Sequence, residues 1–275
     1  MKINSRSVRL SILMIWALIC ITPIFWIFST AFKPNEEATR FPPTLIPKEA
    51  TLNNFSYILN DEMLFRSLLN SLFVSIAAAV LCVVISALAG YAFSRYQFKG
   101  KNVLMSLLLG SFLIPPVVNI IPIYVEFSYL FGSTNSLLQL IIVYQLLILP
   151  LNVFLFKNYF DTIPLELEES ALVDGCHRFQ AFYKIALPLS TPAIVAAALF
   201  AFRFAWDEFI FALTFISSPD KNVFAAAIYN FVGLYEVQYG YLAAAIVIMC
   251  IPPILILVLF QKQIIAGLKM GGVRG

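Results

Sequence analysis

The stretch "SILMIWALICITPIFWIFSTAF" (Ser11–Phe32) carries no charged side chain and is long enough to cross a bilayer as a helix, which takes about 20 residues. Similar apolar runs recur along the 275-residue chain, of which 61% is hydrophobic and 12% is charged. Soluble domains carry about 25% charged residues, and the mean hydropathy here is +0.88. We therefore expect a polytopic membrane protein. No small-residue cleavage site ends the first run, so we interpret it as a retained span and not as a signal peptide.

The expected spans are helical, because the apolar runs are continuous rather than alternating and so few of them could not close a barrel. The predicted fold class is all-α, with a single transmembrane domain over residues 1–275. Six spans are predicted, at about 10–32, 68–93, 103–130, 136–156, 192–216 and 240–262. An even number of spans places both termini on the same side of the membrane.

The lysines and arginines orient the chain. Twelve of the 18 fall on the side of the termini, five fall on the opposite side, and Arg203 lies within a span. Cytoplasmic segments of membrane proteins carry the excess of positive charge. Both termini, and the connection over residues 157–191, are therefore predicted to be cytoplasmic.

Familiar catalytic and metal-binding patterns are missing from the sequence. It contains no G-x-x-x-x-G-K-[ST] phosphate loop, no G-x-S-x-G elbow and no H-E-x-x-H pair, and its single histidine excludes most triads and His-rich metal sites. The four cysteines are scattered, so we interpret them as packing residues. We expect no catalytic residue, no metal site and no cofactor in this chain. The net charge of +3 gives no reason to invoke nucleic acid, and a conduit or scaffold in membrane lipid fits better than an enzyme.

Between two apolar runs lies a polar segment, "EESALVDGCHRFQAFYKIALPLSTP" (Glu168–Pro192). We expect a short surface helix over 161–180, with Pro164 in its first turn, acidic residues near its N-terminus and an apolar stripe. The stripe comprises Leu172, Cys176 and Phe179. Such a helix can lie on the lipid interface or dock into a groove of a soluble partner. Its acid-rich polar face favours the partner, because interfacial helices carry Lys and Arg to meet anionic lipid. Gly175 permits either a close approach of another backbone or a bend.

The spacing in this segment resembles the cytoplasmic signature of the permease subunits of ATP-binding-cassette importers, which reads E-A-A, three residues, G, nine residues, I-x-L-P. Here it is Glu169-Ser170-Ala171, Gly175 and Ile185-Ala186-Leu187-Pro188, with Ser170 as the one departure. Further motifs resemble the carbohydrate branch, and above all the shorter permease of maltose-type importers. These motifs are "FPPTLIP" (41–47), Asn70-Ser71, "YAFSR" (91–95), "IPPVVNIIPIY" (114–124), "WDEF" (206–209) and "GLKMGGVRG" (267–275).

The resemblance implies half of a pore for ATP-driven uptake of a sugar or oligosaccharide across the cytoplasmic (inner) membrane of a prokaryote. It implies four kinds of partner: a second permease, two ATPase subunits that hold ATP and Mg, an extracytoplasmic sugar-binding protein on loops 33–67 and 217–239, and lipid. Residues 157–191 would form the coupling loop that docks on the ATPase. The residues expected to transmit its movement are Glu169, Ser170, Ala171, Asp174, Gly175, Ile185, Leu187 and Pro188.

Charged residues in the fifth expected span are candidates for a substrate pathway. Arg203 and Asp207 are four apart and share a helix face, and Glu208 follows with no obvious partner in the helix. Charges at membrane depth are costly and usually face a bundle interior or a cavity, so the pair either lines the pore or only neutralises itself. Polar candidates in other spans are Asn119, Tyr124, Gln139, Gln145 and Asn152. Each could instead form a helix–helix hydrogen bond.

The third expected span contains Pro115, Pro116 and Pro122, which predict a break or kink there. Two other functions, a secondary transporter and an intramembrane enzyme, fit the sequence less well. A secondary transporter usually carries an inverted repeat or a membrane-buried ion site, and an intramembrane enzyme needs a nucleophile beside its charged cluster. The sequence shows none of these features.

Overall fold

The structure is a computed structural model that describes residues 5–233 and 237–271. In these residues it is helical, with no β-strand and one isolated bridge between Val232 and Val237. The chain divides into two compact units. One comprises residues 1–65 and 227–252, and the other comprises residues 66–226 and 253–275. Each is described by itself, and the single domain predicted from the sequence stays a prediction.

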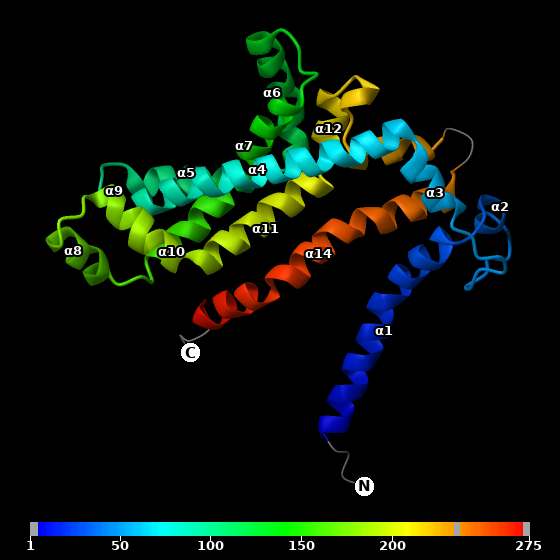
Figure 1. Cartoon of the computed structure of the whole chain (residues 1–275), viewed down its shortest axis with the longest axis horizontal. Coiled ribbons are helices and arrows are strands. Elements are labelled where there is room, and N and C mark those ends of the chain that lie inside the picture. Colours follow the sequence, from blue (N-terminus) through cyan, green and yellow to red (C-terminus); the bar gives the residue numbers. More distant parts are fainter. Residues whose placement is uncertain (1–4, 234–236, 272–275) are drawn as a thin grey trace. The chain divides into compact units, whose positions relative to one another are not determined.

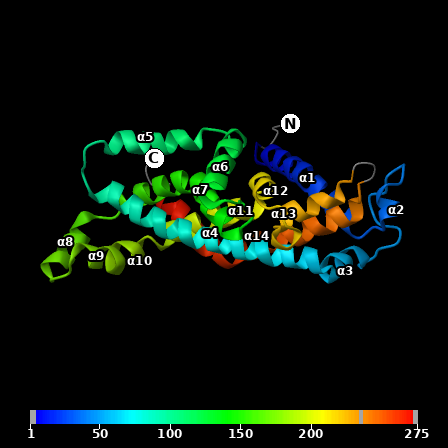
Figure 2. The same ribbon diagram turned by 90° about the horizontal axis from the view of Figure 1, so that it is seen from above.

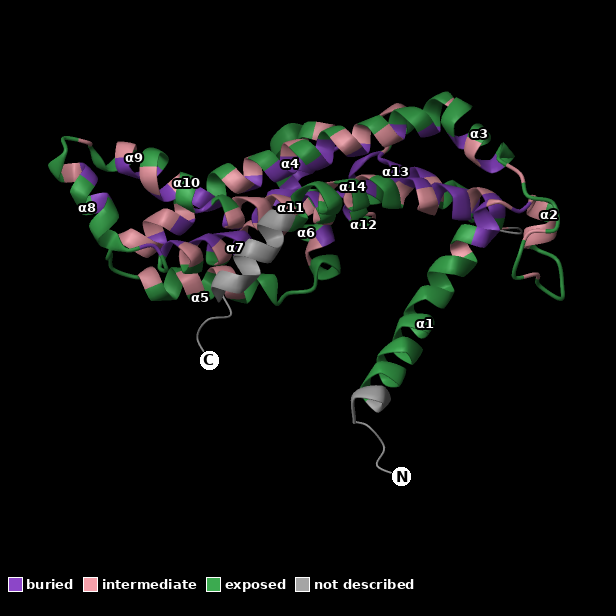
Figure 3. Cartoon of the chain, turned by 60° about the horizontal axis from the view of Figure 1, so that its bottom comes forward, coloured by how far each residue is buried: buried purple, intermediate pink, exposed green. Residues whose placement is uncertain are grey.

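The first unit begins with α1 (Ser5–Ala31), whose apolar surface is almost entirely exposed (Figure 3). None of its most apolar 18-residue window is buried within the chain. A soluble protein rarely exposes an apolar surface of this size. This helix is therefore built to contact lipid or another membrane subunit, as the sequence predicts for the first span.

After α1 the chain forms α2 (Asn35–Ala38) and α3 (Asn53–Asn60), and later enters α14 (Tyr239–Gly271). The buried amide of Asn54 donates to the carbonyls of Ala31 and Lys33, at 2.9 and 2.8 Å. Asn35 accepts a hydrogen bond from the backbone of Gly240 at 2.8 Å. A Cβ atom at residue 240 would lie 2.8 Å from the Asn35 oxygen, so a larger residue would have to displace the Asn35 side chain.

The connection between α2 and α3 is held by the carboxylate of Glu37. It accepts hydrogen bonds from the Lys48 amide at 3.0 Å and from the Thr44 hydroxyl at 2.7 Å. Both bonds favour the charged form, and the backbone bond from Lys48 contributes most to lowering the pKa of Glu37 below its usual value. Glu37 therefore fixes this extended, proline-containing loop.

The second unit is built around α7 (Leu137–Phe160), on which α5 (Lys101–Phe112) and α11 (Thr191–Asp207) pack (Figure 2). Half of the most apolar window of α7 is buried within the chain. Beside it runs α4 (Glu62–Arg95). At Gly90 the two helices meet so closely that an added Cβ would lie 2.5 Å from the Cβ of Phe156.

The remaining elements of this unit, apart from α6, are short. They are α6 (Pro116–Phe131), α8 (Leu165–Val173), α9 (Arg178–Ala181), a π-helical turn (Phe182–Ala186), α10 (Leu187–Leu189), α12 (Ile210–Phe215), a 3-10 turn (Pro219–Lys221) and α13 (Phe224–Ala227). Figure 1 shows α8, α9 and α10 at the end of α4 from which the chain continues to α5.

Four described helices are long and apolar enough to cross a membrane alone, and there are up to six spans if two bent pairs are counted. The third expected span is one of these pairs, because α5 and α6 meet at 103°. Pro116 opens α6 and Pro115 precedes it with extended backbone, so the predicted break is confirmed. Pro122 lies inside α6 without ending it. The other bent pair joins residues Arg178–Leu189 to α11 (Thr191–Asp207) at an angle of 77°.

The fifth expected span is also interrupted near its far end. α11 ends at Asp207, Glu208 is extended (φ −71°, ψ 123°), and α12 begins at Ile210. The residues of the span expected at 192–216 are therefore built into two helices and not into one.

Candidate functional site

The expected surface helix over 161–180 is shorter than predicted. α8 begins directly after Pro164 and ends at Val173. Cys176 and Phe179 lie beyond its end, so the predicted apolar stripe does not exist on one helix. Val173 is 88% exposed, whereas Glu168 and Ala171 are buried. α8 therefore packs on its own chain through a glutamate and an alanine and presents its other faces outward.

Gly175 ends α8 in the left-handed region, with φ of +88°. The amide of Cys176 donates to the Ala171 carbonyl at 2.9 Å, and the amide of Gly175 donates to the Leu172 carbonyl at 3.1 Å. These two bonds form a Schellman motif, which usually requires glycine at this position. No atom would lie within 4 Å of a Cβ at residue 175, so within this chain the glycine serves the bend and not a close approach.

We expect Gly175→Ala to loosen the C-terminal turn of α8, because a left-handed conformation costs a residue with a Cβ about 1–2 kcal/mol. Amide hydrogen exchange over residues 165–176 would measure the change as faster exchange. Gly175→Asn is the matched control, since asparagine tolerates this conformation better than alanine. Equal exchange in wild type and Gly175→Ala would contradict the role of the bend.

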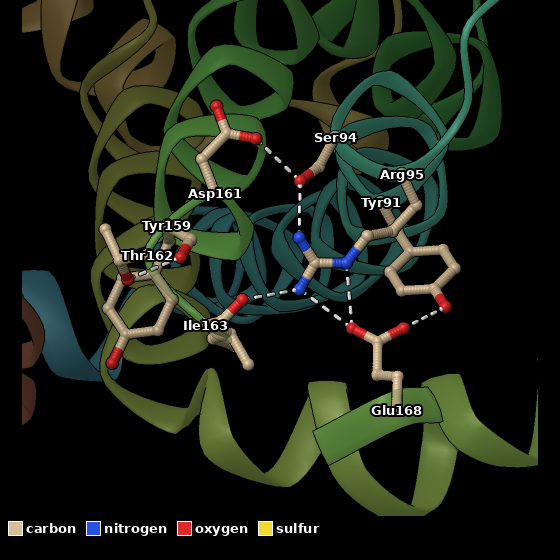
Figure 4. Close-up of polar contacts among 8 residues, drawn as sticks. All are labelled: Tyr91, Ser94, Arg95, Tyr159, Asp161, Thr162, Ile163 and Glu168. Atoms are coloured by element: carbon tan, nitrogen blue, oxygen red, sulfur yellow. Dashed lines mark hydrogen bonds and ion pairs between the residues drawn. The ribbon is translucent and has the colours of Figure 1, made fainter. Parts of the chain in front are cut away.

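The buried Glu168 is the centre of a polar network at the end of α4 (Figure 4). Its carboxylate forms an ion pair with Arg95 at 2.8 Å, and the two side chains are only 6% and 8% exposed. The Tyr91 hydroxyl donates to the same carboxylate at 2.5 Å. Hydrogen bonds that involve charged groups are about twice as strong as neutral ones. This network therefore fastens α8 to α4.

Arg95 also reaches the chain that enters α8. Its guanidinium donates to the Ile163 carbonyl at 3.0 Å and to the Ser94 hydroxyl at 3.1 Å, and Ser94 donates to Asp161 at 2.7 Å (Figure 4). Burial raises the pKa of the Asp161 carboxyl, but hydrogen bonds from Lys157 and Ser94 outweigh it and hold this pKa below its usual value. One arginine thus fixes both the entry to α8 and α8 itself.

Sequence reasoning counts Glu168 only among the acidic residues near the N-terminus of the expected helix, and it gives Arg95 and Tyr91 no role, although both lie in the motif "YAFSR". A signal for Glu168 was present. Positions 168 and 171 share a helix face, and Ala171 already belongs to the signature. A buried glutamate needs a cation, and Arg95 is the basic residue that ends the second expected span.

The residues of the signature lie in two places, some in and just after α8 and the others in the π-helical turn and α10. Glu169, Ser170 and Asp174 are exposed, and Ala171 is buried. Ile185 lies in the π-helical turn, and Leu187 and Pro188 lie in α10. These two elements return the chain to α11, and the neighbouring Phe182 and Ala186 pack with Phe160 in the core of this unit.

Arg203 and Asp207 form the expected pair, with 3.2 Å between Nε and Oδ2. They are 77% and 45% exposed and lie in a hollow of about 670 Å³. Aromatic faces from Phe200, Phe204 and Phe209 line the same hollow. The pair therefore neutralises itself and also faces a cavity, so the two interpretations are compatible in this structure.

Glu208 has partners that the sequence did not reveal. Its carboxylate accepts hydrogen bonds from the amides of Phe211 and Ala212, at 2.9 and 3.1 Å, and from the Tyr144 hydroxyl at 3.0 Å. It borders the hollow, but these bonds tie it to the start of α12. These partners lie on α7 and at the start of α12, outside the helix in which the sequence offers Glu208 no obvious partner.

The other pathway candidates lie outside this hollow. Gln145 is buried and donates to the Ala78 carbonyl of α4 at 3.2 Å, and the fully buried Asn152 donates to Ile148 at 3.0 Å. Gln139 donates to the Ser133 carbonyl at 2.7 Å. Tyr124 packs edge-on against Phe215, and Asn119 is half-buried on α6. The bond of Gln145 therefore joins α7 to α4, whereas the bond of Asn152 stays within α7.

Residues 82–270 match the family model described as the binding-protein-dependent transport system inner membrane component. This chain belongs to that family. The predicted resemblance to importer permeases is therefore confirmed, and the protein is a permease subunit of an ATP-binding-cassette importer, located in the inner membrane. In this family ATP hydrolysis belongs to a separate subunit, so the permease itself is not an enzyme.

Curated relatives match this permease over nearly all of its length. It is 33% identical to the sulfoquinovosyl glycerol transport system permease protein SmoH of Agrobacterium fabrum, over 98% of this chain and 93% of the relative. It is also 33% identical to the trehalose/maltose transport system permease protein MalG of Thermococcus litoralis, over 94% and 93%. A bacterial importer of the acidic polysaccharide alginate has a similar fold, with a TM-score of 0.80, 22% identity and coverage of 95% and 99%.

Proposed function

We propose that this permease forms half of the pore for ATP-driven uptake of a sugar or oligosaccharide. Relatives named for the transport of trehalose, maltose, diacetylchitobiose and sulfoquinovosyl glycerol support this substrate class. The other half is a second permease, and both termini lie in the cytoplasm, as the distribution of lysine and arginine indicates. Two ATPase subunits hold ATP and Mg, and a sugar-binding protein docks on the opposite side. A solved relative contains a periplasmic protein bound to alginate pentasaccharide.

The exposed surface of α8 is the observation that carries this proposal. Glu169, Ser170 and Asp174 point away from the chain's own core, and Val173 adds an unpartnered apolar side chain. A helix that is fixed on one face and free on the other suits a groove on a soluble partner. In the proposed complex this surface enters the ATPase. Ala171 and Gly175 shape it, and Ile185, Leu187 and Pro188 connect it to α11.

The proposal is tested by purifying the tagged chain in mild detergent beside Glu169→Ala and Gly175→Asp. Wild type is expected to bring down an ATPase and a second permease, and the variants are expected to lose the ATPase or its coupled hydrolysis. Uptake of solute into vesicles by the chain alone, without ATP, would instead support a secondary transporter.

The hollow around Arg203 and Asp207 is our candidate for the sugar pathway. Sugars bind through hydroxyl contacts to charged or polar groups and through apolar contacts to aromatic faces, and this hollow offers both. Asn119, Tyr124, Gln139 and Glu208 stay secondary candidates. For Gln145 and Asn152 we favour helix packing.

Removing both charges separates the two roles of the Arg203–Asp207 pair. If the pair only neutralises itself, the double variant Arg203→Leu/Asp207→Leu keeps its uptake rate, because no unpaired charge is left. We expect instead that uptake falls at least about tenfold, which corresponds to 1.4 kcal/mol, while the complex still assembles. Uptake by the reconstituted complex, with recovery of the partner subunits as the control, measures this. Full uptake by the double variant would remove the hollow from the pathway.

A further inference from the structure

α4 differs from the other long apolar helices in having no proline. Among the four described helices that can span a membrane alone, α1 contains Pro23, α7 contains Pro150, and α14 contains Pro252 and Pro253. Proline removes a backbone hydrogen bond and kinks a helix. With 34 residues, α4 is about 50 Å long. It is therefore suited to carry a displacement from one end to the other without bending at a weak point.

One end of α4 holds α8. As described above, Arg95 and Tyr91 bind the carboxylate of Glu168, and Arg95 also binds the Ile163 carbonyl. These contacts fix the direction and the register of α8 against α4, which apolar contacts alone would not do. A movement of α8 that left α4 in place would have to break this network and leave buried charges unpaired.

The other end of α4 holds the loop over residues 216–223. The amide of Asn70 donates to the carbonyls of Asp220 and Asn222, at 3.1 and 2.9 Å. The buried hydroxyl of Ser71 accepts a hydrogen bond from the Phe224 amide at 2.7 Å. The loop and the first residue of α13 therefore cannot shift relative to this part of α4 without losing three hydrogen bonds.

We propose that α4 is a strut that links α8 to the 216–223 loop, with Arg95 and Asn70 as the positioning residues at its two ends. Asn70 and Arg95 are 25 residues apart in the sequence, about 38 Å along the helix axis. A push on α8 moves α4 and with it the loop on the opposite side. The direction of this signal rests on the proposed function, in which α8 meets the ATPase.

The first test traps nucleotide on the ATPase, which acts on α8, and measures amide exchange at the opposite end of α4. The complex that purifies with the tagged chain is compared with and without ATP plus orthovanadate, and amide exchange is followed over residues 216–226. Trapping is expected to change exchange there in wild type. In Arg95→Lys, which keeps the charge but not the forked geometry, we expect this response to be lost when samples that hold equal amounts of trapped nucleotide are compared. Lys99→Ala is the matched control, because Lys99 is exposed beyond the end of α4.

The second test needs no partner subunit. Asn70→Asp keeps the shape of the side chain but removes the donor to the two loop carbonyls. We expect it to change amide exchange in α8, over residues 165–173, whereas Asn60→Asp on an exposed amide of α3 does not. A purely local role would change exchange only near residues 216–226.

The outcomes separate the two proposals. If no nucleotide-binding partner purifies with wild type, the proposed function fails, and the Asn70→Asp experiment still tests the strut. If the partner is present but trapping leaves residues 216–226 unchanged, or if Arg95→Lys keeps the full response, the strut is overturned. An effect of Asn70→Asp confined to its own end of α4 overturns it as well.

Discussion

Replacing Glu168 with alanine is expected to detach α8 from the end of α4. The substitution leaves the guanidinium of Arg95, whose side chain is only 8% exposed, without its carboxylate, and it removes the acceptor of the Tyr91 hydroxyl. Removing one partner of a buried ion pair typically costs about 3–5 kcal/mol. The loss would be measured as faster amide exchange over residues 165–173 and as weaker recovery of the ATPase.

Two variants control this prediction. Glu169→Ala removes the neighbouring, exposed glutamate, and such surface changes usually alter stability by within about 0.5 kcal/mol. Its effect is therefore expected on ATPase recovery and not on exchange within α8. The double variant Arg95→Met/Glu168→Leu is expected to regain much of the lost attachment, because apolar replacement of a whole buried pair is often neutral. Equal exchange in Glu168→Ala and Glu169→Ala would show that the network does not hold α8.

Features that depend on local sequence were predicted well. The long apolar runs gave the membrane helices, since crossing a bilayer demands length and composition that are visible in a single stretch. The break at Pro115 and Pro116 was also predicted, because proline acts on its own backbone and its neighbours. The spacing of Glu169, Gly175 and Pro188 led to the family that the comparison confirms.

Features that depend on contacts between distant segments were not predicted. Glu168 and Arg95 are 73 residues apart, and nothing in their own neighbourhoods pairs them. The end of α11 at Asp207 depends in the same way on Glu208, whose partners include Tyr144 on α7. The spacing of residues within one helix cannot show which charged residue has a partner on another helix. The hollow beside Arg203 also depends on contacts between distant segments, since α6 and α11 both line it.

Replacing Gly90 with alanine is expected to force α4 and α7 apart. The new Cβ would lie 2.5 Å from the Cβ of Phe156 and 2.9 Å from the amide nitrogen of Lys157. One of these atoms is in the backbone, so rotation of a side chain cannot relieve the clash, and α4 and α7 must separate. Overpacking of this kind typically costs about 1–3 kcal/mol. A lower midpoint of thermal unfolding in detergent would measure it.

Gly110→Ala is the matched control, because it makes the same change on α5, where no atom would lie within 4 Å of the new Cβ. Alanine is favoured over glycine inside a helix by about 1 kcal/mol, so this variant is expected to be as stable as wild type or more stable. Both positions are helical, so the opposite effects of the two substitutions on stability follow from packing alone. If Gly90→Ala were as stable as Gly110→Ala, α4 and α7 would not be in contact at this glycine. The Arg95 network lies about one turn further along α4. Without this contact, α4 would not be fixed to α7 at the point where the network attaches α8.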